Sequence, residues 1–205
     1  MKSCRFPWCD HPQRWLNKMK NPYDDRYDQD AYYWGFKPSS TCLRVLQLLP
    51  PEKPLKLLDI GCGEGRNAVF FARNGYEVTA FDLSSKGVEK TKALAENIGV
   101  NINVFEADVL KYRLKEPFDI LFSTGVFHYV PNSLRTEMIN NYMEHTMPSG
   151  LNVFSVFVKK PFIPKAPDAE SIANHWKSGE LFMYYHVALR RYLIVIQVVF
   201  HINML

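Results

Sequence analysis

The stretch that decides the fold is residues 57–67, Leu57-Leu58-Asp59-Ile60-Gly61-Cys62-Gly63-Glu64-Gly65-Arg66-Asn67. An apolar run ends at Ile60, three glycines follow at alternate positions, and a helical pattern begins after them. Glycine allows positive φ angles and lets a ligand approach the backbone without meeting a Cβ atom. The stretch therefore predicts a strand, a tight turn that binds a nucleotide-type ligand, and a helix. A turn that only reverses the chain is the alternative.

Strands and helices alternate on both sides of this turn. The expected strands are 56–60, 77–81, 101–106, 118–123 and 151–158. The expected helices begin at Ser39-Ser40-Thr41, near Gly65, at Ser84 or Ser85, and at Ser133 as a cap, and Pro148-Ser149-Gly150 breaks the last of them. Helical crossovers between strands imply a parallel sheet that is covered on both faces. The predicted fold class is α/β, a doubly wound, mostly parallel sheet.

Composition bounds the class of protein. The chain has 205 residues, of which 47 % are hydrophobic and 22 % charged, with a net charge of +4. These values are typical of one soluble globular domain and exclude disorder, collagen and coiled coil. Basic residues form no cluster longer than a pair such as Lys159-Lys160, so we expect no nucleic-acid partner.

The chain ends and the cysteines set further expectations. The N-terminus lacks the apolar core of a signal peptide, and no apolar run has the roughly 18 residues of a membrane helix. We therefore expect a cytoplasmic protein with no membrane partner. Cys4, Cys9, Cys42 and Cys62 are expected to be reduced thiols. Cys4 and Cys9 lack a second Cys/His pair, so no metal site is expected.

Three acids lie at or near the carboxyl ends of three successive predicted strands. Asp59 precedes the glycines, and an anionic carboxylate there suits a ligand with a cationic end and disfavours a pyrophosphate. Asp82 closes the second strand, where a carboxylate accepts both ribose hydroxyls. Asp108 follows the third strand, where it is placed to accept from an adenine amine. The dinucleotide pattern Gly-x-Gly-x-x-Gly would need a glycine at Arg66, so NAD fits less well than an amino-acid-bearing nucleoside.

At these residues the chain resembles a known family. The run 59–65 with Asp82 and Asp108 is similar to the S-adenosylmethionine-binding motifs of class I methyltransferases, over about residues 40–160. Among the class I methyltransferases, the chain resembles the tellurite-resistance methyltransferases of the TehB type. That second resemblance rests on the segments 21–27, Tyr33-Trp34-Gly35, Gly65-Arg66-Asn67, 179–181 and Tyr184-Tyr185. The resemblance implies a Rossmann-like fold and S-adenosyl-L-methionine as cofactor.

The resemblance also implies a set of site residues. The cofactor-binding residues it implies are Asp59, Gly61, Cys62, Gly63, Gly65, Asp82, Leu83, Ala107, Asp108, Val109, Thr124, Gly125, Tyr33 and Trp34. His128 is the catalytic candidate, because an imidazole there would hold or deprotonate a substrate; a hydrogen-bonded packing residue is the alternative. Tyr33, Trp34 and Lys37 are lid candidates, whereas Arg66 is either a site residue or an exposed residue of the helix.

The implied reaction is methyl transfer from a sulfonium to a small-molecule acceptor. Tellurite, selenite or a thiol are the acceptors implied, and such soft nucleophiles need no strong general base. The alternative is a binding module that holds the cofactor without turnover, and an NAD-dependent oxidoreductase is a third reading. We expect a monomer or a homodimer.

Three segments are expected along the chain. Residues 1–38 form an aromatic-rich arm, with nine aromatics in the first 36 positions, that either packs on the domain or closes over a ligand. Residues 39–186 form the methyltransferase domain. Residues 187–205 are an atypical apolar segment, too short for the two antiparallel strands that normally end such domains. The segment is one strand completing a shortened sheet, a dimer-interface element, or an altered end, so the C-terminal strand pair is expected to be incomplete.

Overall fold

The computed structural model describes residues 23–158 and 176–185, together with the backbone of Leu193–Val199. Six strands form one sheet in the order β3-β2-β1-β4-β5-β6, and every neighbouring pair is parallel. The strands are β1 (Lys56–Ile60), β2 (Glu77–Asp82), β3 (Ile102–Glu106), β4 (Phe118–Ser123), β5 (Thr146–Phe157) and β6 (Leu193–Val199). The helices are α2 (Asp24–Tyr27), α3 (Ser40–Leu48), α4 (Arg66–Arg73), α5 (Ser85–Ile98), the 3-10 turn η2 (Phe127–Tyr129), α6 (Asn132–Glu144) and α7 (Glu180–Tyr185).

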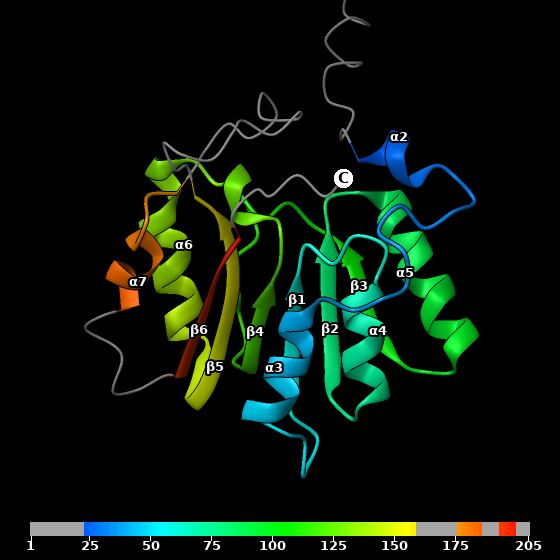
Figure 1. Ribbon diagram of the computed structural model, residues 1–205, viewed down its shortest axis with the longest axis horizontal. Helices are drawn as coiled ribbons and strands as arrows, with labels where there is room; N and C mark the ends of the chain where they lie inside the picture. The colour runs from blue at the N-terminus through cyan, green and yellow to red at the C-terminus, as the bar shows by residue number, and fades with distance from the viewer. Residues whose placement is uncertain (1–22, 159–175, 186–192, 200–205) are drawn as a thin grey trace, which may run out of the picture.

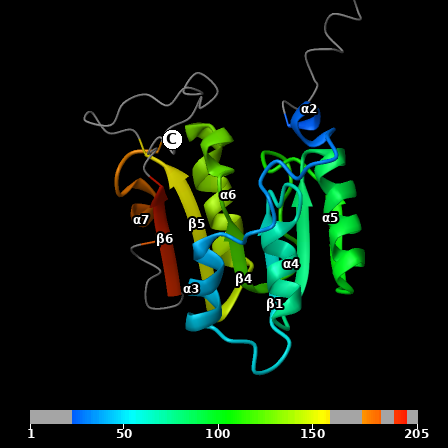
Figure 2. The ribbon, with the colours of Figure 1, turned by 45° about the vertical axis from the view of Figure 1, so that its right-hand side comes forward.

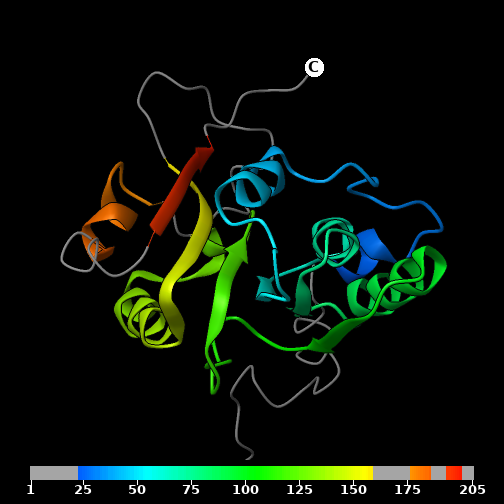
Figure 3. The same ribbon diagram turned by 90° about the horizontal axis from the view of Figure 1, so that it is seen from below.

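Helices cover both faces of the sheet, as the sequence predicts. Figure 3 shows α3, α4 and α5 on one face and α6 and α7 on the other. One core, which includes Val45, Phe71 and Phe122, lies under the first group, and a second, which includes Met138, Phe154 and Trp176, lies under the other. Parallel strands buried on both faces are typical of doubly wound α/β folds. The predicted fold class is confirmed.

The carboxyl ends of the strands meet at one edge of the sheet, at the top of Figure 1. Ile60, at the end of β1, pairs with Phe81, and Asp59 pairs with Phe122 on β4. The short helix α2 lies over this edge beside the start of α5, as Figure 2 also shows. Ligands of open α/β sheets bind at this edge, where the strand order reverses between β1 and β4.

The fifth strand begins earlier than predicted. Pro148-Ser149-Gly150 does not separate helix from strand, since β5 starts at Thr146 and contains all three residues. Phe118 pairs with Thr146 but Ile120 pairs with Leu151, so extra residues bulge from β5 at this point. Ser149 accommodates the bulge with a φ of 63°. A β-bulge keeps the strand in the sheet although its sequence is typical of a turn.

The start of α6 also differs from the prediction. Ser133 does not cap this helix, because the first helical residue is Asn132 and Pro131 precedes it. The proline is compatible with a helix start because its missing N–H would have no partner there. The predicted cap at Ser84 is correct, since its hydroxyl accepts a hydrogen bond from the Gly87 N–H.

The C-terminal segment supplies one strand to the described sheet. The backbone of β6 pairs with β5 in parallel: Leu193 lies opposite Leu151 at one end, and Val199 lies opposite Phe157 at the other. This agrees with a single strand completing a shortened sheet and differs from an antiparallel pair. Residues 187–192 and 200–205 lie outside the described residues, as do Cys4 and Cys9. Within the described ranges, no helix has both the length and the apolar character to cross a bilayer, and no metal-binding cluster of His, Cys, Asp or Glu occurs.

Candidate functional site

The glycine turn between β1 and α4 is tightly packed from both sides. Gly61 has a φ of +72°, and a Cβ atom on it would lie 2.2 Å from Cγ2 of Val126 in the loop after β4. Gly63 has a φ of +57°, and a Cβ atom there would lie 2.9 Å from the Tyr27 hydroxyl. Only glycine combines a favourable positive φ with the absence of a Cβ atom, so both positions require it. The turn thus lies between the arm and the β4 loop.

Asp59 is buried beneath this turn. Its side chain is 1 % exposed, and one carboxylate oxygen accepts a hydrogen bond from the Ala68 N–H. The other oxygen, Oδ2, has no hydrogen-bond partner within the described part of the chain. Burial, and then the nearby Asp82 carboxylate, raise the pKa of Asp59 to about 7. A buried carboxylate without a full set of donors favours a cationic or hydrogen-bond-donating ligand group.

Asp82, at the end of β2, connects two loops. Its Oδ2 atom accepts from the Gly63 N–H at 2.8 Å, and its Oδ1 atom accepts from the Ser84 N–H at 2.9 Å. Burial raises the pKa of Asp82, while these backbone donors lower it. Each carboxylate oxygen still has a lone pair for a further donor, so ribose hydroxyls remain compatible with this carboxylate.

The remaining predicted cofactor residues lie along the same edge. Asp108 accepts from the Leu110 N–H at 2.9 Å, and Leu83 is 49 % exposed. Ala107 and Val109 are partly buried against the core below α6. Cys62 is buried beside Thr91 rather than open to a ligand.

The arm is fixed to the glycine turn by Glu64. Its Oε1 and Oε2 atoms accept from the Tyr33 and Trp34 N–H groups, both at 3.1 Å. Oε1 also accepts from Lys90 Nζ on α5 at 2.8 Å. Sequence reasoning did not assign Glu64 a role; its only signal was an acid placed among the three glycines.

The aromatic residues of the arm lie over the turn. The Trp34 indole N–H donates to the Tyr27 hydroxyl at 2.9 Å, and Tyr27 is buried. Arg66 donates to the Trp34 carbonyl at 3.0 Å, which gives Arg66 a structural contact with the arm. Lys37, the third lid candidate, is exposed and makes no hydrogen bond or ion pair with this group within the described residues. The arm therefore packs against the turn, and the same contacts place Tyr27 and Trp34 over the predicted ligand position.

The loop after β4 carries two predicted cofactor residues, Thr124 and Gly125, and the catalytic candidate His128. Thr124 accepts a hydrogen bond from Asn67 at 3.2 Å, and the Gly125 N–H donates to Ser155 at 3.1 Å. His128 is 5 % exposed, and its ring centroid lies 4.0 Å from that of Tyr129. His128 is therefore buried, and it lies beside Tyr129, which contacts Tyr23 of the arm.

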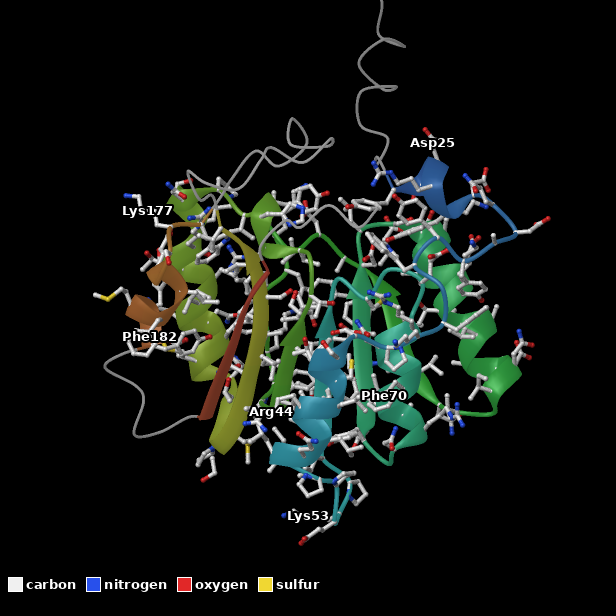
Figure 4. The ribbon with its side chains drawn as sticks, viewed as in Figure 1. Asp25, Arg44, Lys53, Phe70, Lys177 and Phe182 are labelled. Atoms are coloured by element: carbon white, nitrogen blue, oxygen red, sulfur yellow. The ribbon has the colours of Figure 1, made fainter. Side chains whose placement is uncertain are left out.

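A separate cavity of about 810 Å³ lies at the opposite edge of the sheet. Its lining includes Lys56, Tyr76, Asn101 and Glu116, at the amino ends of the strands. None of the predicted site residues lines it. The two edges are far apart in Figure 4, where the labelled Asp25 marks the α2 end and Lys53 the other.

Comparisons with known proteins identify the family of the chain. A family model described as tellurite resistance protein TehB matches residues 24–192. The chain belongs to the TehB family. The resemblance inferred from the motifs is therefore confirmed.

Two curated relatives and one solved structure extend the comparison. TehB of Haemophilus influenzae, named a probable S-adenosyl-L-methionine-dependent methyltransferase, is 30 % identical over 161 residues, 75 % of this chain and 56 % of the relative. A ubiquinone biosynthesis O-methyltransferase of Rickettsia canadensis is 31 % identical over 111 residues, 53 % of this chain and 46 % of the relative. The crystal structure of Haemophilus influenzae TehB superposes with a TM-score of 0.61 at 24 % identity, covering 80 % of this chain and 53 % of that one, which shows a shared fold. The chain spans about half the length of these curated relatives.

Proposed function

We propose that this chain is an S-adenosylmethionine-dependent methyltransferase that acts on a small-molecule acceptor. The observation that carries the proposal is the Asp59 carboxylate, which is buried beneath the glycine turn with Oδ2 unpaired in the described structure. A ligand with a cationic amino-acid end would satisfy this carboxylate, whereas the pyrophosphate of NAD would be repelled by it. Membership of the TehB family supports the same ligand.

The other acids at this edge would contact the ribose and the adenine of the cofactor. Asp82 would accept from the ribose hydroxyls while keeping its bonds to the Gly63 and Ser84 N–H groups. Asp108 would accept from the adenine amine, with Leu83 and Val109 against the adenine ring. When bound, the cofactor supplies an electrophilic methyl group on a sulfonium. The role of the protein is to orient the acceptor and to exclude water.

The proposed acceptors are tellurite, selenite or a thiol. Each has a nucleophilic lone pair, so the site needs no strong base, and His128 is the proposed acceptor-side residue. Tyr27 and Trp34 cover the turn from the solvent side, and this arrangement supports a water-poor reaction site. An anionic acceptor also needs a cation near the turn.

The test begins with thermal melts of the purified chain. S-adenosylmethionine or S-adenosylhomocysteine at 100 times its dissociation constant should stabilise the fold by about 2.7 kcal/mol, which is several degrees at this size. NADH should leave the melting temperature unchanged. Methyl transfer to tellurite, selenite and a thiol is then assayed. Binding without transfer would identify a non-catalytic module, and a larger shift with NADH would contradict the proposal.

Asp82→Ala is expected to remove most of the cofactor affinity. Because Asp82 also holds Gly63 and Ser84, Asp82→Asn is measured beside it, since the amide keeps one acceptor oxygen and the side-chain volume. The Asn variant leaves one of the two N–H groups without an acceptor, so it should melt between the wild type and Asp82→Ala. It should bind S-adenosylhomocysteine at least about tenfold more weakly, a loss typical of one charged hydrogen bond. Wild-type affinity in both variants would remove the ribose assignment.

A further inference from the structure

The guanidinium group of Arg26 lies between two aromatic rings at the carboxyl edge of the sheet. Its Cζ atom is 5.1 Å from the Tyr23 ring centroid and 5.5 Å from the Tyr33 ring centroid. A cation–π contact does not satisfy the hydrogen-bonding capacity of the five guanidinium N–H groups, which remain donors for carboxylates and oxyanions. The structure gives these N–H groups neither a hydrogen bond nor an ion pair with any residue that it describes.

The acids near Arg26 are bonded to other groups. Asp24 accepts from the Ser84 hydroxyl, and Asp28 lies 3.6 Å from Lys86 Nζ. Asp25 points away from the sheet at the outer end of α2 in Figure 4. The arginine therefore has no carboxylate partner within its own helix, although three acids lie within two residues of it.

Two further carboxylates at this edge are also occupied. Glu64 pairs with Lys90 and with two N–H groups of the arm. Asp82 accepts from the backbone of Gly63 and Ser84. A partly buried guanidinium with unused donors, beside the Asp24, Asp28, Glu64 and Asp82 carboxylates that bond other groups, is a receptor for an incoming anion.

The same aromatic cluster connects Arg26 to the proposed reaction site. Tyr129, in the loop after β4, donates its hydroxyl hydrogen to Tyr23 at 2.9 Å, and the two rings meet edge to face at 6.2 Å. Tyr27, one residue after Arg26, contacts Gly63 of the turn. The tyrosines beside Arg26 thus contact both the glycine turn and the loop that carries His128.

We propose that Arg26 is the anion-binding residue of this site, which takes a carboxylate or a small oxyanion in the plane of its guanidinium. The inference rests on the proposed function and adds a substrate class to it. Two ligands share the required chemistry: the carboxylate at the amino-acid end of the cofactor, and an oxyanion acceptor such as selenite. Arg26→Gln and Arg26→Lys are the test variants, and Arg44→Gln, an exposed arginine on α3, is the matched control.

The first arm measures binding without turnover. Calorimetry compares S-adenosylhomocysteine with 5′-methylthioadenosine, which lacks the carboxylate. If Arg26 binds the cofactor carboxylate, Arg26→Gln weakens S-adenosylhomocysteine about tenfold or more and leaves methylthioadenosine unchanged. Arg26→Lys should lose less, because it keeps the charge but not the bidentate geometry.

The second arm measures the acceptor. If Arg26 binds the acceptor, Arg26→Gln leaves S-adenosylhomocysteine affinity unchanged, raises KM for selenite about tenfold or more and leaves KM for a neutral thiol unchanged. If Arg26→Gln has wild-type values in both arms, or if Arg44→Gln shows equal losses, the inference about Arg26 is overturned while the proposed function stands. A wild-type chain that binds neither adenosyl ligand overturns the proposed function and this inference together.

Discussion

The Glu64 carboxylate lies 2.8 Å from Lys90 Nζ, and the Glu64 side chain is only 1 % exposed. This pair connects the glycine turn to α5, while the same carboxylate holds the backbone of Tyr33 and Trp34. One acid therefore determines both the shape of the turn and the position of the arm. A buried carboxylate with three donors is stable only while all its partners remain in place.

Glu64→Ala is expected to destabilise the fold by about 2 kcal/mol, because it leaves Lys90 and two N–H groups without their acceptor. The value is below that of a fully buried pair because Lys90 is 17 % exposed and water can solvate it. A thermal melt should show a decrease of roughly 4–8 °C for a domain of this size.

Glu89→Ala is the matched control for this loss. Glu89 is on α5, the helix that carries Lys90, and lies 3.4 Å from Lys86, but it is 67 % exposed. Exposed pairs contribute about 0–1 kcal/mol, so this variant should melt close to the wild type. Equal losses in the two variants would mean that Glu64 acts only as a surface charge.

Gly61→Ala is expected to cost roughly 3 kcal/mol, from a strained positive φ and from overpacking against Val126. Gly99→Ala separates the two causes. Gly99 has a similar φ of +76° but no atom within 4 Å of its would-be Cβ, so the loss there should be about 1 kcal/mol. Urea denaturation measures both losses. Adding Val126→Ala to Gly61→Ala should recover part of the loss, and no recovery would show that the contact with Val126 is unimportant.

Much of this architecture is predictable because its signals are local. The apolar run before Gly61 and the helical pattern after Gly65 each concern neighbouring residues, and both were predicted correctly. The predicted start of β5 was wrong because the residue types of Pro148-Ser149-Gly150 are typical of a turn. Only the pairing with β4 keeps these residues in the sheet.

The contacts of the arm were beyond sequence reasoning. Glu64 meets Tyr33 and Trp34 about 30 positions away, between two loops without any periodic pattern. The parallel direction of β6 was equally unpredictable, because strand direction depends on the path of the chain before it rather than on the residues of the strand. The positions of the acids at the carboxyl edge could be predicted from the sequence, whereas their hydrogen-bond partners could be identified only from the three-dimensional structure.

Asp59 should make the stability of the fold depend on pH. Its pKa is raised from 3.8 to about 7, chiefly by burial, so between these values the folded chain keeps a proton that the unfolded chain has lost. Stability must therefore fall as pH rises from about 4 to about 7, because the folded state has to bury the charge. The pKa of Asp82 is raised as well, which acts in the same direction.

Asp59→Asn removes this titration while its amide oxygen can still accept from the Ala68 N–H. The variant should match the wild type near pH 4 and exceed its free energy of unfolding by about 2–4 kcal/mol at pH 8. The same change should weaken S-adenosylhomocysteine binding at pH 8, since the neutral amide no longer attracts a cationic amino group. Urea denaturation at pH 4, 6 and 8 measures the first effect and calorimetry the second. Asp30→Asn, at an exposed position of the arm, is the control and should follow the wild-type profile. An Asp59→Asn variant with the pH dependence of the wild type would show that Asp59 does not titrate in this range.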